Sequence, residues 1–328
     1  MGQSRNAFPL IVSQYALVEE RGKIGGGAYG EVFLYRDTAT GELVAVKRCR
    51  IAPDEAPGEV WAERMATCAI REASVLEELQ RSGGHENIIR FKGTRMIEER
   101  SYLLLAFQYV EHNLSEFMRE FHERPEFDPQ IPKILLFQIL KGVHHLHKNM
   151  IMHRDLKPQN VVIDKERTQI CLLDFGLARG FSLPAQRYSP EVVTSVYRAP
   201  ELLLGVRQYT AAVDIWSVGC IFAEMINGQV LFLPENQEPQ EWSIFRTMGI
   251  PQNLAQLLNF DGPLAPIFQP RPAVPLADIV PRLRAEPHGL DLLSRMLKYA
   301  PAERIIASDA LRHPYFQDLP AEMLVGLP

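Results

Sequence analysis

Two short segments carry most of the residue types that could do chemistry. One reads HRDLKPQN and ends at Asn160, and the other reads DFG and begins at Asp174. Asn160 and Asp174 offer the hard oxygen ligands that Mg²⁺ prefers. Asp155 could accept the proton of a substrate hydroxyl, and Lys157 could neutralise a phosphate. Together these residues predict phosphoryl transfer, which needs charge neutralisation, in-line geometry and a base near the attacking oxygen.

A glycine-rich segment and a strand lysine could hold the phosphates of a nucleotide. Residues 25–30 read GGGAYG and fit G-x-G-x-x-G-x-V, in which glycines let the backbone amides approach an anion. A plain hairpin turn has the same composition, and a dinucleotide-binding motif is disfavoured because a strand follows, not a helix. Lys47 alone would more often be a solvated charge. Glu72, on a predicted helix, supplies a carboxylate that could pair with Lys47 and aim it at phosphate.

The surrounding pattern predicts an α+β fold with two lobes. Short β-runs separated by glycine and turn residues are expected at residues 15–24, 31–36, 43–49, 88–97 and 102–109. Helices are expected at residues 59–80, 134–147, 213–227 and 290–297. We expect one catalytic domain at 15–317, made of a β-rich N-lobe (15–107), a hinge (108–113) and a mainly helical C-lobe (114–317). Tails occupy residues 1–14 and 318–328, and residues 251–287 read as an irregular surface excursion.

The bulk composition excludes several classes of protein. The 328 residues are 46% hydrophobic, and the net charge of -5 gives no general attraction to nucleic acid or anionic membranes. No apolar run reaches the roughly eighteen residues of a membrane helix, and the first residues lack a signal peptide's apolar stretch. Asn6 stands where a myristoylation motif needs Ser or Thr. Four scattered cysteines favour reduced thiols over zinc or disulfides. We therefore expect neither nucleic acid nor membrane as a partner, and a location in the nucleus and/or cytoplasm.

Further motifs identify the family that these segments resemble. Residues 199–201 read APE, residues 214–219 read DIWSVG, and Arg304 lies near the end, as in protein kinases. The form DLKPQN resembles serine/threonine kinases. The segment ATCAIRE, at residues 66–72, is similar to the PSTAIRE helix of cyclin-dependent kinases. DFGLAR, EVVT, YRAPE and WSVGCIFAE resemble the same family.

The resemblance implies a serine/threonine protein kinase that uses ATP and Mg²⁺. It implies catalytic roles for Asp155, Lys157, Lys47 and Glu72, and magnesium binding by Asn160 and Asp174. It implies ATP-binding roles for Ile24, Gly25, Gly26, Gly27, Ala28, Tyr29, Gly30, Val32, Ala45, Lys47, Phe107, Gln108, Val110 and Asn113. Among these, Phe107 would lie behind the nucleotide, the backbone of Gln108 and Val110 would hold adenine, and Asn113 would lie at the ribose. It also implies a buried Glu201–Arg304 pair and an Asp214 that braces the catalytic loop.

The resemblance extends to regulation. A cyclin-like subunit would contact the helix at residues 66–72, with Ile70 facing it. Ser189 aligns with the activating phosphorylation site, and the resemblance implies that Arg71, Arg154 and Arg179 converge on its phosphate. Val192, Val193 and Arg198 would shape a pocket for proline, so substrates would carry Ser/Thr-Pro. Tyr29 could be an inhibitory phosphosite or merely the aromatic tip of the loop.

The sequence departs from the family pattern at several places. Ala66 replaces the proline of PSTAIRE, so the helix can begin a turn or more earlier, and the identity of the cyclin is open. Ser189 and Pro190 replace threonine and histidine, and Val196 replaces a tryptophan. Pro234 opens a stretch that departs from the one that binds Cks-type adaptors.

Three other functions remain as alternatives. A mitogen-activated kinase is disfavoured because no Thr-x-Tyr lies between Asp174 and Glu201. A cyclin-independent kinase of this fold stays open. A pseudokinase scaffold would need a defect in the catalytic set, and the sequence shows none.

Overall fold

The computed structural model describes residues 10–12, 14–18, 22–27, 30–51, 59–97, 101–123, 126–166, 168–180, 196–206, 208–236, 238–258 and 269–327. Contacts divide the chain into two compact units, which are treated separately below. The first unit comprises Met1–Glu111 with Leu173–Ala178, and the second comprises His112–Leu172 with Arg179–Pro328. The predicted α+β class is confirmed, with a β-rich part followed by a mainly helical one. The predicted lobe limits stay predictions.

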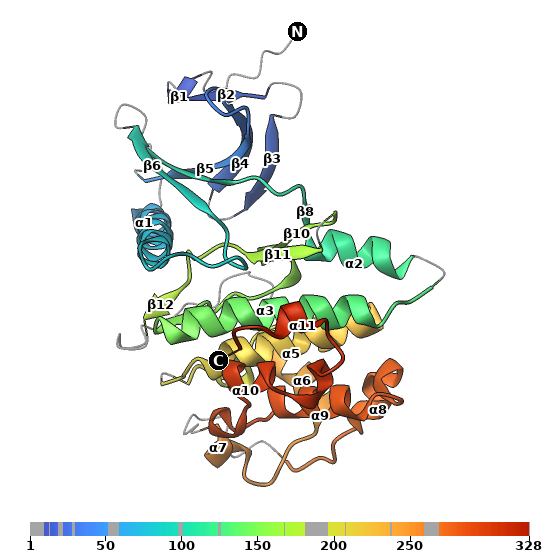
Figure 1. Cartoon of the computed structure of the whole chain (residues 1–328). Helices are drawn as coiled ribbons and strands as arrows, with labels where there is room; N and C mark the ends of the chain where they lie inside the picture. Colours follow the sequence, from blue (N-terminus) through green and yellow to red (C-terminus); the bar gives the residue numbers. More distant parts are fainter. Residues whose placement is uncertain are drawn as a thin grey trace. The chain divides into compact units, whose positions relative to one another are not determined.

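An antiparallel sheet builds the first unit (Figure 1). Its main path runs β1-β2-β4-β5-β7-β6, and β3 pairs with β4 beside this path. The strands are β1 (Leu10–Val12), β2 (Tyr15–Leu17), β3 (Lys23–Gly27), β4 (Gly30–Asp37), β5 (Leu43–Arg50), β6 (Phe91–Ile97) and β7 (Tyr102–Gln108). The predicted single run over residues 15–24 is wrong, because it is two strands. Gly22 lies between them with a φ of 46°, a left-handed conformation that interrupts a strand.

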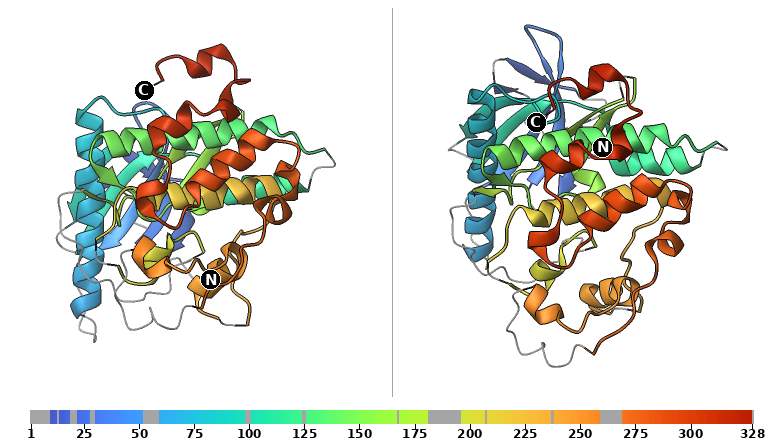
Figure 2. Two further views of the ribbon diagram at one scale, coloured as in Figure 1. Left: turned by 90° about the horizontal axis from the view of Figure 1, so that it is seen from below. Right: turned by 60° about the horizontal axis from the view of Figure 1, so that its bottom comes forward.

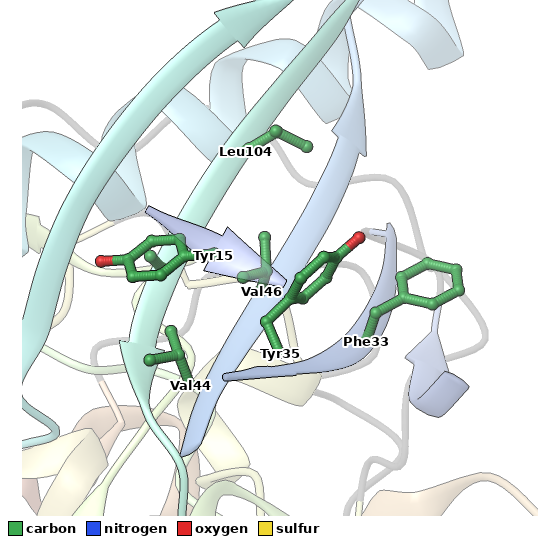
Figure 3. Packing of buried hydrophobic residues seen from close by; sticks show 7 residues of the cluster. Tyr15, Phe33, Tyr35, Val44, Val46 and Leu104 are labelled. Atoms are coloured by element: carbon green, nitrogen blue, oxygen red, sulfur yellow. The ribbon is translucent and has the colours of Figure 1, made fainter. Parts of the chain in front are cut away.

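One face of this sheet carries an apolar cluster (Figure 3). Phe33 and Tyr35 of β4 pair in register with Val46 and Val44 of β5, and all four are buried. Side chains alternate between the two faces of a strand, so Lys47 takes the face opposite to Val46. The cluster therefore anchors β5 and leaves its other face for the charged residue.

Helix α1 (Glu59–Arg81) is longer than a helix beginning at Ala66 would be. This confirms the expectation that the missing proline lets the helix begin earlier. Ala69, Leu76 and Leu79 are buried, at spacings that place them along one face of the helix, and α1 packs against β5 and β6. Ile70 lies on a different face and is 53% exposed. The helix thus has one face against the sheet and another open to solvent.

The second unit is mainly helical (Figure 2). Its helices are α2 (Leu114–His122), α3 (Gln130–Lys148), α4 (Pro200–Leu203), α5 (Ala212–Asn227), α6 (Gln240–Met248), α7 (Leu254–Leu257), α8 (Leu276–Ile279), α9 (Pro287–Met296), α10 (Ala307–Leu311) and α11 (Ala321–Leu324). Its short strands are β8 (His112–Asn113), β9 (Ile151–Met152), β10 (Val161–Asp164), β11 (Gln169–Leu172) and β12 (Arg179–Gly180). The predicted helices at 134–147, 213–227 and 290–297 are confirmed as α3, α5 and α9, with ends that differ by at most four residues.

Helix α5 forms the centre of the second unit. Almost every residue from Val213 to Ile226 is buried, and α5 packs against α3 and α9. Its end is set by Gly228, whose φ of 77° is the left-handed C-cap conformation. In the segment predicted to be irregular, the described residues include the short helices α7 and α8 and a 3-10 helix at Pro281–Leu283, and α9 begins at its last residue; residues 259–268 lie outside the described part. Among the residues that the structure describes, no helix is long and apolar enough to span a membrane.

His122, at the end of α2, is held as a neutral imidazole. Its Nε2 lies 3.1 Å from the carbonyl oxygen of Met225, and Arg282 donates to its Nδ1 at 3.1 Å. Partial burial lowers the pKa of His122 below its ordinary value of 6.5, and the charge of Arg282 adds to this. An Nδ1 that accepts from a guanidinium carries no proton, so the geometry and the direction of the pKa agree.

This arrangement predicts a pH-dependent contribution to stability. Because the folded-state pKa lies below the unfolded one, the contribution is complete above about pH 6.5 and is lost as the pH falls through the lower, folded value. We expect the free energy of unfolding of His122→Gln, which can accept and donate but cannot titrate, to fall less steeply between about pH 7 and pH 5 than that of the wild type. Denaturant titrations at several pH values measure this, and parallel slopes would contradict it.

Candidate active site

The first unit joins three of the predicted catalytic residues. Lys47 Nζ donates to Glu72 Oε2 at 2.7 Å and to Asp174 Oδ1 at 3.3 Å. The pairing of Lys47 with Glu72 follows the sequence prediction, and it links β5 to α1. The amide of Phe175 also donates to Glu72, so the DFG segment is tied to the same carboxylate. Leu173–Ala178 groups with the sheet for this reason, although the sequence placed it in the C-lobe.

Electrostatics keep Lys47 charged. Burial alone would favour the neutral amine, but the carboxylates of Asp174 and Glu72 outweigh it and raise the pKa of Lys47 above its ordinary value. The ammonium group is therefore a fixed positive charge at physiological pH. Such a charge, held by a buried partner, can align phosphate oxygens without first being reorganised.

The glycine-rich segment forms a tight hairpin between β3 and β4. Gly25 pairs with Val32, and Gly27 pairs with Gly30. A Cβ on Gly30 would lie 2.5 Å from the carbonyl oxygen of Arg48, and the φ of Gly30 is 142°, so only glycine fits there. Ala28 and Tyr29, the tip of the predicted phosphate loop, lie outside the described residues. Their roles stay predictions.

Most of the remaining residues with a predicted nucleotide contact lie in the strands of the first unit or just after β7. Phe107 packs on Phe91, with ring centroids 5.6 Å apart. The amide of Gln108 donates to the carbonyl of Arg90 at 2.9 Å. The adenine contact predicted for the backbone of Gln108 and Val110 stays a prediction. Four other residues predicted to bind ATP lie in the first unit, namely Ile24 in β3, Val32 in β4, Ala45 in β5 and Val110 after β7.

Asn113 has a structural role that the sequence did not predict. Its side-chain oxygen accepts from the amide of Glu116 at 3.0 Å, and Glu116 accepts in return from the amide of Asn113 at 3.1 Å. This reciprocal pair is a capping box that begins α2. The ribose contact assigned to Asn113 stays a prediction.

The catalytic loop of the second unit holds Asp155 by two donors. Lys157 Nζ donates to Asp155 Oδ2 at 2.8 Å, and Asn160 Nδ2 donates to the same oxygen at 3.0 Å. Asn160 Nδ2 also donates to the Asp155 carbonyl oxygen at 2.8 Å. Two donors on Oδ2 fix the orientation of the carboxylate, which a general base needs before substrate arrives.

Asp214 of α5 braces this loop, as the sequence predicted. Its Oδ2 accepts from the amide of His153 at 2.9 Å, and its Oδ1 accepts from the amide of Arg154 at 2.8 Å. Burial alone would raise the pKa of Asp214, but the hydrogen bond and charge of His147 and the amide of Arg154 hold it below its ordinary value. The buried carboxylate therefore stays ionised and keeps both amides in place.

The residues predicted to bind magnesium have the right donor chemistry. Asn160 uses its Nδ2 on Asp155, which leaves its carbonyl oxygen Oδ1 as a hard ligand. Asp174 supplies a carboxylate. Among the described residues no group of three or more His, Cys, Asp or Glu could hold a metal ion. Mg²⁺ is usually bound through one or two protein ligands together with substrate phosphates, so two oxygen donors would be enough for the predicted site.

The predicted phosphate-binding arginines are spread over both units. Arg71 of α1 donates to the carbonyl oxygen of Gly176 at 3.0 Å, a contact that the sequence did not suggest. Arg154 lies in the catalytic loop, and Arg179 pairs with Met152 between β12 and β9. Ser189 lies outside the described residues. The convergence of the three arginines on a phosphate at Ser189 stays a prediction.

The predicted pair Glu201–Arg304 is confirmed. Arg304 Nη1 and Nη2 donate to the two carboxylate oxygens of Glu201 at 2.6 and 2.7 Å, with both side chains buried. The guanidinium also donates to backbone carbonyls of Lys298, Ala212 and Tyr299. This pair ties α4 to the residues after α9.

Removing one member of this pair should strongly destabilise the fold. We expect Arg304→Met to lower the free energy of unfolding by about 3–5 kcal/mol, because it leaves the Glu201 carboxylate buried without its cation. Denaturant unfolding measures the loss. Arg312→Met, which breaks the exposed pair with Asp309, is the matched control and should lose no more than about 1 kcal/mol. Equal losses in the two variants would contradict the prediction.

Sequence reasoning missed two residues that support the catalytic loop. His147, near the end of α3, places Nε2 at 2.9 Å from Asp214 Oδ2. Tyr209, ahead of α5, lies under the guanidinium of Arg154, with Cζ at 5.4 Å from the ring centroid. His147 lies six residues before the HRD motif, a spacing that could have suggested it. No local pattern marks Tyr209, because its partner is 55 residues earlier.

Comparison with known proteins agrees with this geometry. A protein kinase domain model matches residues 18–316. Cyclin-dependent kinase B2-2 of Arabidopsis thaliana is 38% identical over 321 residues, which cover 96% of this chain and 98% of that protein. Cyclin-dependent kinase B2-1 of the same plant is 38% identical over 317 residues, which cover 95% and 97%. With the catalytic set in place in both units, the chain belongs to the cyclin-dependent kinase family of ATP-dependent serine/threonine protein kinases.

Proposed function

We propose that this chain, activated by a cyclin-like subunit, transfers the γ-phosphate of Mg²⁺-bound ATP to Ser or Thr followed by Pro. The support is the family, the intact catalytic residues and the EVVT and YRAPE motifs. The nucleus and/or cytoplasm is the proposed location. Proline specificity rests on sequence motifs, since Val192 and Val193 lie outside the described residues.

The residues divide the chemistry between them. Lys47 aligns phosphate oxygens, and Glu72 holds Lys47 in place. Asp155 accepts the proton of the substrate hydroxyl or orients that hydroxyl, and Lys157 neutralises charge that develops on the transferred group. Asn160 and Asp174 would hold Mg²⁺, which offsets the negative charge of the phosphates when it is bound.

The observation that carries the proposed partner is the division of α1 into two faces. Ile70 is 53% exposed, whereas Glu72, two residues on, is buried and bonded to Lys47. A subunit bound over Ile70 would fix the same helix that positions Glu72. Its binding would thereby stabilise the Lys47–Glu72 pair and raise activity.

A panel of recombinant cyclins tests this proposal. We expect one of them to raise the activity of the wild type on a Ser-Pro peptide, and Ile70→Glu to abolish that rise by placing a charge in an apolar contact. Gln80→Glu adds the same charge ten residues along the exposed part of α1 and should respond like the wild type. Full activity without any cyclin would favour the cyclin-independent alternative.

Ser189 is the proposed activating phosphosite. Its position in the motif pattern and the presence of Arg71, Arg154 and Arg179 support this, because a phosphate can make one to three charge-assisted hydrogen bonds to such a cluster. Pro190 makes Ser189 resemble a substrate of a proline-directed kinase. Active enzyme should carry phosphate at Ser189 by mass spectrometry, and Ser189→Ala should be less active. An unmodified active enzyme with an equally active alanine variant would refute it.

A further inference from the structure

The backbone of Arg154 is held in an unfavourable conformation. Its φ is 73°, in the left-handed region that residues other than glycine rarely adopt. The amide of Arg154 donates to Asp214 Oδ1 at 2.8 Å, which supports this conformation from one side. Asp155 follows directly along the chain. The direction in which its carboxylate leaves the backbone therefore depends on the conformation of Arg154.

The side chain of Arg154 contacts a residue close in sequence to Asp214, which holds its amide. Its guanidinium carbon lies 5.4 Å from the centroid of the Tyr209 ring, within the range of a cation–π contact. Tyr209 precedes Asp214 by five residues, just ahead of α5, and its side chain is half-buried. One short stretch, residues 209–214, thus holds both the amide and the guanidinium of Arg154.

We propose that Tyr209 is a positioning residue for the kinase reaction, acting through Arg154 on Asp155. The ring holds the face of the guanidinium, while the amide of Arg154 is held by Asp214. Two attachments fix the residue more firmly than one, and so keep φ in the left-handed region. The stack uses the face of the guanidinium and not its N–H edges, which are the part of an arginine that pairs with anions such as phosphate.

The proposal explains why an aromatic ring is needed at this position. A cation–π contact depends on the ring face and needs no hydroxyl, so phenylalanine should replace Tyr209. Leucine has an apolar side chain but no ring face. Tyr209→Leu should remove this restraint on the guanidinium, let Arg154 relax and misalign Asp155, while nucleotide and peptide binding are left largely intact.

Steady-state kinetics test the proposal on the full chain with the activating cyclin. For Tyr209→Leu we expect kcat to fall about three- to thirtyfold, with the KM values for ATP and peptide within about twofold of the wild type. Tyr209→Phe should restore kcat. Phe127→Leu is the matched control, because it removes another stack of the second unit, that of Arg282 at 4.5 Å, and should leave kcat unchanged. If Tyr209→Leu does not fold, Tyr209→Met, which also lacks a ring, replaces it in the same assay.

A double-mutant cycle separates positioning from a general loss of stability. If Tyr209 acts through Arg154, Tyr209→Leu should have little further effect on kcat in an Arg154→Met background. Additive effects, or a Tyr209→Leu variant with wild-type kcat, would overturn the proposal. The kinetic measurements rest on the proposed function, because they need an enzyme that is active with a cyclin. If the wild type shows no turnover with any cyclin, that function fails, and the same cycle measured on Tm still tests the contact between Tyr209 and Arg154.

Discussion

Replacement of Asp155 by Asn should reduce phosphoryl transfer by about two to four orders of magnitude and leave the fold intact. The amide has nearly the same shape as the carboxylate, and its oxygen can still accept from Lys157 and Asn160, which now donate to Asp155 Oδ2. What it cannot do is accept the proton of the substrate hydroxyl. Transfer of labelled phosphate from ATP measures the rate, and thermal stabilisation by ATP measures binding.

Asp309→Asn provides the matched control for this variant. Asp309 is an exposed carboxylate of the same unit, paired with Arg312. Its replacement makes the same chemical change away from the catalytic loop and should leave the rate unchanged. Turnover at the wild-type level in Asp155→Asn would refute the assignment of Asp155 as the catalytic carboxylate.

Replacement of Lys47 by Met should reduce activity by about 100-fold or more, because phosphate alignment is lost. The variant also leaves Glu72 buried without the cation that now lies 2.7 Å away, so it should be less stable. Lys47→Arg separates the two effects. It keeps the positive charge, and with it more of the stability, but a planar guanidinium does not replace a compact ammonium, so activity should still be low.

Lys23→Met is the control for charge removal in the same sheet. Lys23 is exposed, and its partner Glu31 is half-buried and also pairs with Arg48, so the variant should behave almost like the wild type. Kinase assays and thermal unfolding of the three variants give the comparison. If Lys47→Met and Lys23→Met had equal activities, Lys47 would have no special role.

The parts of the site that could be predicted are those encoded by local patterns. The motif around Asp155 and the helix carrying Glu72 are read from adjacent residues, and the early start of α1 follows from the missing proline before Thr67. Each of these depends on a few positions close together in the sequence. The same holds for β4 and β5, which the β-runs expected at residues 31–36 and 43–49 predict.

What could not be predicted depends on contacts between distant residues. The bond of His147 to Asp214 spans 67 positions, and that of Arg71 to Gly176 spans 105. Neither residue stands in a pattern that names its partner. The break at Gly22 was missed because a single glycine between two segments with apolar residues also fits a continuous strand.

The alternation along β5 divides the effects of inherited or engineered variants into two kinds. Val44 and Val46 belong to the apolar cluster, so changes there would reduce the amount of folded enzyme in a cell. Lys47, between Val46 and Arg48, bonds to Glu72 on the opposite face, so a change there that keeps the positive charge, such as Lys47→Arg, would leave protein that is present but largely inactive. Only the second kind could compete with the normal enzyme for a shared partner. Substitutions at neighbouring residues of one strand would thus differ in their genetic effect. Those that reduce the amount of folded protein would be recessive, and those that leave an inactive protein would be dominant.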